Sequence, residues 1–241
     1  MQQQYDQYTS DNHEVWQILY QRQVDNLTDK ACPEYLQCLD DMYPHFQAAH
    51  IPNFTDVADL LYRRTGWGIE VVKGIIPVED FVELLSQRRF PSSTWLRRRD
   101  QLDYLEEPDM FHDSFGHMPL LMHPLFAQFM EEFGKLGSQY RHNPNCIEQL
   151  QRLYWFSIEF GIIRSQENKC KIYGAGIISS YGETNHIYAP NVEIVPFDLD
   201  TIIHTHFRTD QIQTRYFEIA SFEQLFAAVG QLQNSYEAAN A

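Results

Sequence analysis

The sequence has few cysteines and no cysteine pair with metal-binding spacing. Its 241 residues include only Cys32, Cys38, Cys146 and Cys170, and no C-x-x-C occurs. Cys32 and Cys38 are too far apart for a zinc knuckle. A chain of this length buries enough surface to fold without disulfide bonds. We therefore expect reduced thiols and a cytoplasmic protein.

Basic charge and long apolar runs are also scarce. Lysine and arginine number 18 against 33 acidic residues, which gives a formal charge of −15. Such a surface repels nucleic acids and anionic membranes. No window approaches the roughly 18 apolar residues of a membrane span, and the N-terminus does not resemble a signal peptide. From the charge and the lack of apolar runs we expect no membrane or nucleic-acid partner. No heptad run is long enough for a coiled coil, so we expect a monomer.

What the sequence does contain predicts one mainly helical domain. Hydrophobic residues make up 44% of the chain and aromatic residues 14%, as in a globular protein. Helical periodicity runs from Asp11 to about Thr65 and returns in later segments, whereas short β-branched runs at 70–76, 192–197 and 216–219 favour strands. We expect mainly α structure with a few short β-strands, a disordered N-terminus over 1–12, a single domain over 13–235 and a short tail over 236–241.

Two helices near the centre of the chain have predicted boundaries. Pro124 suits the first position of a helix, and Gly137 could cap its end. Asn145 and Glu148 have the spacing of a capping box, which predicts the start of the helix that carries Glu159.

Three side chains of the types that can bind a metal stand in apolar surroundings. His112 and His117 lie among Phe, Met and Leu, and Glu159 shares a helical face with Trp155. Such polar groups are costly to bury unless they are paired or coordinated. Two imidazoles and one carboxylate on one face of a metal are typical of non-haem Fe(II) sites that react with oxygen.

The spacing of the two histidines excludes one common zinc site. Zinc proteases use H-E-x-x-H at i, i+4, but here Asp113 follows His112 and the second histidine is one residue further along. At i, i+5 on an α-helix the two rings would point about 140° apart. We expect the backbone to leave helical geometry near Gly116 and Pro119. Iron, zinc, manganese and uncoordinated core histidines all remain open at this point.

Three longer motifs carry a family resemblance. They are P-D-x-x-H-D-x-x-G-H-x-P-L at 108–120, Y-W-F-x-x-E-F-G at 154–161, and Y-G-A-G-I-I-S-S-Y-G-E at 173–183. In this order they resemble the signatures of the pterin-dependent aromatic amino acid hydroxylases, over a match from Phe81 to Phe222. The resemblance implies a single catalytic domain that uses Fe(II), tetrahydrobiopterin or another tetrahydropterin, and O2 as co-substrate. The chain is most similar to short bacterial members, which hydroxylate the ring of L-phenylalanine to give L-tyrosine, for phenylalanine catabolism or tyrosine biosynthesis.

The resemblance also assigns roles to individual residues. The implied iron ligands are His112, His117 and Glu159. The implied substrate-binding residues are Arg97, Tyr104, Pro108, Asp109, Trp155 and Ser179. Among these, Arg97 would hold the amino acid's carboxylate, Asp109 would brace Arg97, and Ser179 would also support His112. The implied pterin-binding residues are Phe81 and Asp113, and Tyr154 is the implied catalytic residue beside the iron.

Several alternatives stay open on the sequence. A tyrosine or tryptophan hydroxylase of the same family would share these motifs, although Trp155 disfavours tryptophan because tryptophan hydroxylases tend to carry a smaller aromatic residue there. A zinc-dependent hydrolase could use the same three ligands. The metal could also be structural in a protein without catalytic activity.

Overall fold

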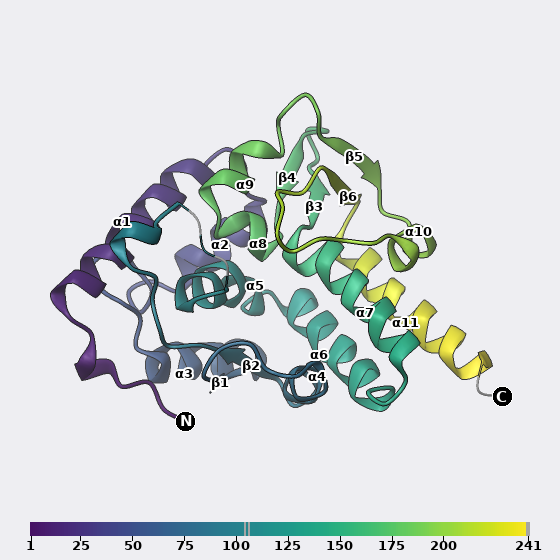
Figure 1. Cartoon of the computed structure of the whole chain (residues 1–241), viewed down its shortest axis with the longest axis horizontal. Coiled ribbons are helices and arrows are strands. Elements are labelled where there is room, and N and C mark those ends of the chain that lie inside the picture. Colours follow the sequence, from purple (N-terminus) through teal and green to yellow (C-terminus); the bar gives the residue numbers. More distant parts are fainter. Residues whose placement is uncertain (104, 106, 240–241) are drawn as a thin grey trace.

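The computed structural model describes residues 1–103, 105 and 107–239, and most of them are helical (Figure 1). The α-helices are α1 (Ser10–Leu27), α2 (Pro33–Asp41), α3 (Phe54–Thr65), α4 (Val78–Ser86), α5 (Met118–Leu121), α6 (Pro124–Gln139), α7 (Pro144–Tyr154), α8 (Ala175–Ile178), α9 (Tyr181–His186), α10 (Leu199–His204) and α11 (Phe222–Ala239). Two π-helical segments, His112–His117 and Trp155–Glu159, join them, with 3-10 turns at Tyr5–Gln7 and Arg99–Gln101. The mainly α prediction is confirmed.

The strands form two small sheets. Their bounds are β1 (Gly68–Val71), β2 (Arg89–Ser92), β3 (Ile162–Arg164), β4 (Cys170–Ile172), β5 (Glu193–Pro196) and β6 (Arg215–Ile219). β1 and β2 pair in parallel, and the second sheet has the order β4-β3-β6-β5, with only β3–β4 antiparallel. The predicted strands at 192–197 and 216–219 are confirmed to within a residue. The strand predicted at 70–76 ends at Val71, and Ile75 is exposed.

The N-terminal residues lie against the domain. The Tyr5 hydroxyl donates to the Ile51 carbonyl at 2.8 Å, and the Tyr8 hydroxyl donates to the Thr94 carbonyl at 2.6 Å. Thr9 and Asn12 then form a capping box that starts α1. At the other end α11 continues to Ala239. The division into 1–12, 13–235 and 236–241 stays a prediction.

The glycine predicted to end helix α6 lies instead where α4 packs against it. A Cβ at Gly134 would lie 2.4 Å from the Ser86 nitrogen, and one at Gly137 would lie 2.6 Å from Val82 Cγ1. Pro124 does occupy the first turn of α6, but the predicted cap at Gly137 is wrong, since the helix continues to Gln139. Gly137 is needed for the approach of α4 and not for helix termination.

The predicted capping box at Asn145 and Glu148 is also wrong. Asn143 is the cap, because its side chain accepts from the nitrogens of Asn145 and Cys146, and Pro144 follows at the first helical position. α7 ends at Tyr154, and Glu159 lies in the π-helical segment that continues it.

A cluster of aromatic side chains anchors the segment that carries both histidines. Trp16 of α1 contacts Phe111 edge-on at 5.4 Å, and Phe111 stacks on Phe115 at 4.8 Å. The Tyr35 hydroxyl donates to the Phe115 carbonyl at 2.7 Å. All four residues are fully buried, which fixes this segment in the core.

Two further observations concern the cysteines and the length of the apolar helices. The four cysteines are free thiols, and only Cys170 is partly exposed. Within 1–103, 105 and 107–239, no helix is long and apolar enough to span a bilayer.

Candidate active site

The π-helix His112–His117 brings the two histidines together. A π-helix closes its hydrogen bonds between residues i and i+5, so residues five apart share a face. The two Nε2 atoms lie 3.3 Å apart. The whole segment is widened, which corrects the expected break at Gly116 and Pro119. Gly116 serves a different purpose, because a Cβ there would lie 2.9 Å from the Ala175 carbonyl oxygen of α8.

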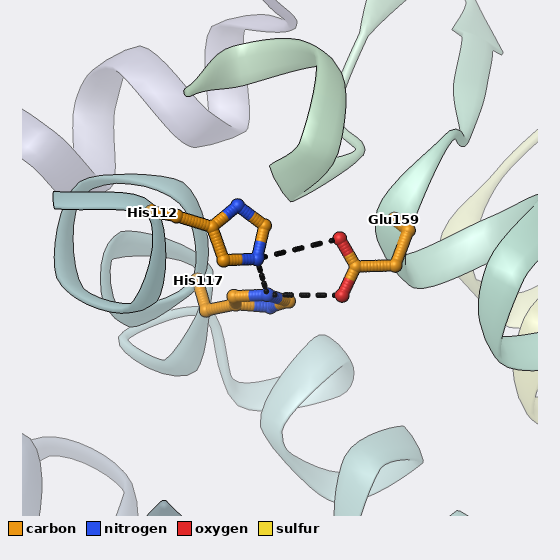
Figure 2. A group of neighbouring side chains, drawn as sticks. All are labelled: His112, His117 and Glu159. Atoms are coloured by element: carbon orange, nitrogen blue, oxygen red, sulfur yellow. Dashed lines mark hydrogen bonds and ion pairs between the residues drawn. The ribbon is translucent and has the colours of Figure 1, made fainter. Parts of the chain in front are cut away.

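Glu159 faces the histidines from the opposite side (Figure 2). Its Oε1 lies 3.2 Å from His117 Nε2, and its Oε2 lies 3.6 Å from His112 Nε2. The three ligand atoms all fall within 4.8 Å of one another. Two ligand atoms about 2.1 Å from one metal and at right angles to each other would be about 3 Å apart, so the group fits one ion bound on a single face.

Ser179 determines which nitrogen of His112 is free. The Ser179 hydroxyl donates its only proton to the Ala175 carbonyl at 2.8 Å, so it must accept from His112 Nδ1–H, also at 2.8 Å. The Nε2 lone pair then points toward Glu159. Burial lowers the pKa of His112 to about 4, which keeps the ring neutral and able to bind a metal.

Glu159 is held as a carboxylate. Burial raises its pKa, but the imidazoles of His117 and His112 and the hydroxyl of Tyr154 outweigh burial and lower it to about 2. Tyr154 stays protonated, because burial and the neighbouring Glu159 raise its pKa well above the usual value. Two imidazoles and one carboxylate suit a divalent iron, and the residues therefore fit the implied metal.

A cavity of about 680 Å³ opens beside these ligands. Among the sequence-predicted residues, its walls include Phe81, Arg97, Pro108, His112, Tyr154, Trp155, Glu159 and Ser179. Tyr104, also predicted to bind substrate, lies outside the described residues. Asp109 and Asp113 are not part of the described lining.

Asp109 lies behind the cavity and holds Arg97. Arg97 Nε and Nη2 donate to the two oxygens of Asp109 at 2.8 and 2.9 Å, and both residues are buried, at 7% and 0% exposure. Burial raises the pKa of Asp109, but Arg97 more than offsets it and the pKa is lowered overall. Arg97 also lines the cavity, and its Nη1 group has no hydrogen-bond partner among the described residues.

Asp113 contacts the backbone directly after β2. Its Oδ2 accepts from the Ser93 backbone nitrogen at 2.7 Å, and burial raises the pKa of its carboxyl to about 7. A direct pterin contact from Asp113 stays a prediction.

Several residues that line the cavity were not predicted from the sequence. Loop 205–214 contributes Phe207 and Ile212, and Glu183 lines the cavity next to that loop. Glu183 ended one of the quoted motifs, so its position was available as a signal. The loop is polar and without periodicity, and nothing in its sequence marked it.

The chain matches a known protein family across nearly its whole length. The model for the biopterin-dependent aromatic amino acid hydroxylases matches residues 4–237. The chain belongs to this family. A phenylalanine-4-hydroxylase of Ralstonia nicotianae is 45% identical to the chain over 233 residues. The match covers 95% of the chain and 72% of the relative.

Solved hydroxylase structures share its fold. The Chromobacterium violaceum phenylalanine hydroxylase with bound iron(III) and oxidised 7,8-dihydrobiopterin superimposes with a TM-score of 0.90 at 42% identity, covering 99% of this chain and 86% of that one. The same enzyme with bound iron and phenylalanine gives 0.88 at 41% identity, covering 95% and 82%. The predicted single hydroxylase catalytic domain is confirmed as a fold.

Proposed function

We propose that the chain is an iron- and tetrahydropterin-dependent phenylalanine 4-hydroxylase that converts L-phenylalanine and O2 to L-tyrosine. The observation that carries the proposal is the convergence of His112, His117 and Glu159 beside a cavity that also exposes Arg97. The relatives named phenylalanine-4-hydroxylase support the substrate.

His112, His117 and Glu159 would hold the metal. Ferrous iron bound there supplies open positions for O2 and, with a tetrahydropterin as electron donor, the oxidising power for ring hydroxylation. The protein's own part is to keep Nε2 of His112 free of a proton and the Glu159 carboxylate ionised. Ser179 performs this for His112 by holding the proton on Nδ1.

Arg97 is placed to bind the carboxylate of the amino acid. Its guanidinium is already oriented by two hydrogen bonds to Asp109, so little freedom remains to be lost when a ligand binds. A planar guanidinium also matches a carboxylate in a bidentate way that lysine does not.

Aromatic side chains would position the substrate ring and the pterin. Trp155 and Pro108 form an apolar wall for the ring, next to Glu159. Phe81 packs edge-on against Tyr154 at 5.3 Å and offers its face for stacking with a pterin. Holding both molecules beside the metal ligands raises their effective concentration and excludes bulk water.

The family match favours hydroxylation over the zinc-hydrolase alternative and over a purely structural metal. A tyrosine or tryptophan preference is the closer rival, since those hydroxylases would use the same ligands. A monomeric state and a cytoplasmic location stay predictions.

The test is an assay of purified, iron-loaded protein with tetrahydrobiopterin and each of phenylalanine, tyrosine and tryptophan. Oxygen uptake is followed, and products are identified by mass spectrometry. We expect tyrosine from phenylalanine as the fastest reaction. Faster turnover of tryptophan or tyrosine would overturn the substrate, and full zinc occupancy without pterin-dependent oxygen uptake after iron loading would overturn the reaction.

A further inference from the structure

We infer that Gln213 is a positioning residue that sets the orientation of Trp155 in the wall of the substrate cavity. This inference rests on the proposed function, and it concerns a residue that does not itself lie in that wall. Gln213 is 8% exposed and belongs to loop 205–214, which runs along the cavity.

The side-chain amide of Gln213 has only one possible orientation. Trp155 Nε1–H is a donor, and it lies 3.1 Å from Gln213 Oε1. The carbonyls of Arg208 and Gln211 are acceptors, and they lie 3.0 and 2.9 Å from Gln213 Nε2. Because an indole cannot accept and a carbonyl cannot donate, the amide oxygen must face Trp155. All three contacts are satisfied at once.

The backbone of Gln213 is fixed as well. Its N–H donates to Glu183 Oε1 at 3.2 Å, and the other oxygen of Glu183 accepts from the Tyr216 hydroxyl at 2.7 Å. Glu183 belongs to α9 and Tyr216 to β6, so Gln213 is tied to two separate elements. A side chain held in this way has little freedom to follow movements of Trp155.

The indole transmits this restraint to the cavity. Trp155 stacks on Phe207 of the same loop with ring centroids 4.5 Å apart and planes at 15°, and it contacts Phe160 at 4.6 Å. Apolar stacking alone leaves a ring free to slide in its plane, whereas a hydrogen bond at Nε1 fixes its rotation. Trp155 and Phe207 both line the cavity. Gln213 therefore holds the surface that the aromatic ring of the amino acid would contact.

The first test compares Gln213→Met with the wild type. Methionine keeps the length and approximate volume but removes the amide, leaving the indole N–H without its acceptor. We expect the KM for phenylalanine to rise roughly 5- to 20-fold while kcat falls less than about 3-fold and the KM for tetrahydrobiopterin changes less than about 2-fold. Gln233→Met is the matched control and should leave all three constants unchanged, because that amide contacts Glu237 on an exposed face of α11.

A double-mutant cycle with Trp155→Phe separates positioning from loop stability. Phenylalanine lacks the indole N–H, so in this background Gln213→Met should change the KM for phenylalanine by less than about 2-fold. The same 5- to 20-fold effect in that background would show that Gln213 acts on the loop and not through Trp155, which would overturn the inference. An unchanged KM in Gln213→Met alone would also overturn it.

Two further comparisons keep the test decisive. If Gln213→Met does not fold, as judged by circular dichroism, Gln213→Asn replaces it, because its amide is a methylene too short to reach Trp155 but can still bond within the loop. The same KM rise is expected, and a wild-type KM would contradict it. A wild-type protein that does not hydroxylate phenylalanine refutes the proposed function and this inference together, whereas an active wild type with an unaffected variant refutes the inference alone.

Discussion

The Ser179 hydroxyl bridges His112 and the backbone of α8, with His112 Nδ1 and the Ala175 carbonyl oxygen each 2.8 Å away. The bridge holds the Nδ1 proton and leaves Nε2 to bind the metal. Ser179→Ala removes the acceptor, so the ring can rotate or exchange tautomers. We expect iron affinity to fall roughly 10- to 100-fold.

A titration with Fe(II) under anaerobic conditions, competed with a chelator, measures this change. Ser165→Ala is the control, since Ser165 lies in the turn between β3 and β4 and its hydroxyl accepts only from the Lys169 nitrogen among the described contacts. Equal iron affinity in Ser179→Ala and wild type would show that the serine does not support the ligand.

Arg97→Lys tests the assignment of the carboxylate-binding residue. Lysine keeps the charge next to buried Asp109 but loses the paired geometry that orients the guanidinium. We expect the KM for phenylalanine to rise roughly 10- to 100-fold with a smaller change in kcat. Arg98→Lys is the matched control, because Arg98 is exposed and pairs with Asp100. A rise in the KM for the pterin alone would place Arg97 in the other ligand's site.

The metal site could be predicted from the sequence because the chemistry of its residues is unusual for their surroundings. Two imidazoles and a carboxylate among apolar neighbours suggested coordination but left uncoordinated histidines open, and the resemblance carried by the long motifs supplied the iron ligand set. The π-helical geometry that joins His112 to His117 could not be predicted from their spacing, and neither could the close approach of α8 to Gly116.

Local signals failed where tertiary packing competes with them. Gly137 looks like a helix cap, but it faces Val82 of α4. Asn145 and Glu148 match a capping box, yet Asn143 with Pro144 starts the helix two residues earlier. Gln213 gave no signal at all, because its role depends on Trp155, which is distant in the sequence.

Tyr8→Phe tests whether the N-terminal residues contribute to the fold. The hydroxyl donates to the Thr94 carbonyl at 2.6 Å, close to the segment that leads to Arg97. Its removal should lower the free energy of unfolding by about 1 kcal/mol. Urea denaturation measures this difference, and Tyr62→Phe, at a position 71% exposed, should change nothing. Identical stabilities of Tyr8→Phe and wild type would support the predicted disorder of residues 1–12.

Glu183→Gln should stabilise the protein in a pH-dependent way. Burial raises the pKa of Glu183, despite hydrogen bonds from Tyr216 and Gln213. A carboxyl whose folded pKa is raised contributes stability that is complete below its unfolded pKa of about 4.3 and is lost as the pH rises through the folded pKa. Glutamine has no proton to lose, so the Tm of the variant should exceed that of wild type at pH 7.5.

The difference should shrink at pH 5, because the wild-type carboxyl is then more fully protonated. Differential scanning calorimetry at both pH values measures it, and Glu79→Gln, an exposed position at the start of α4, gives the baseline. A Tm difference that stays constant or grows toward pH 5 would contradict the assigned shift.

The most direct measurement compares iron content and phenylalanine hydroxylation in wild type and Glu159→Ala. Wild type should bind one Fe(II) per chain and produce tyrosine in a tetrahydropterin-dependent reaction. Without the carboxylate, the two imidazoles should hold iron weakly, and tyrosine formation should be lost while the circular dichroism spectrum is retained. A folded Glu159→Ala protein that still makes tyrosine at a rate near that of wild type would contradict the account.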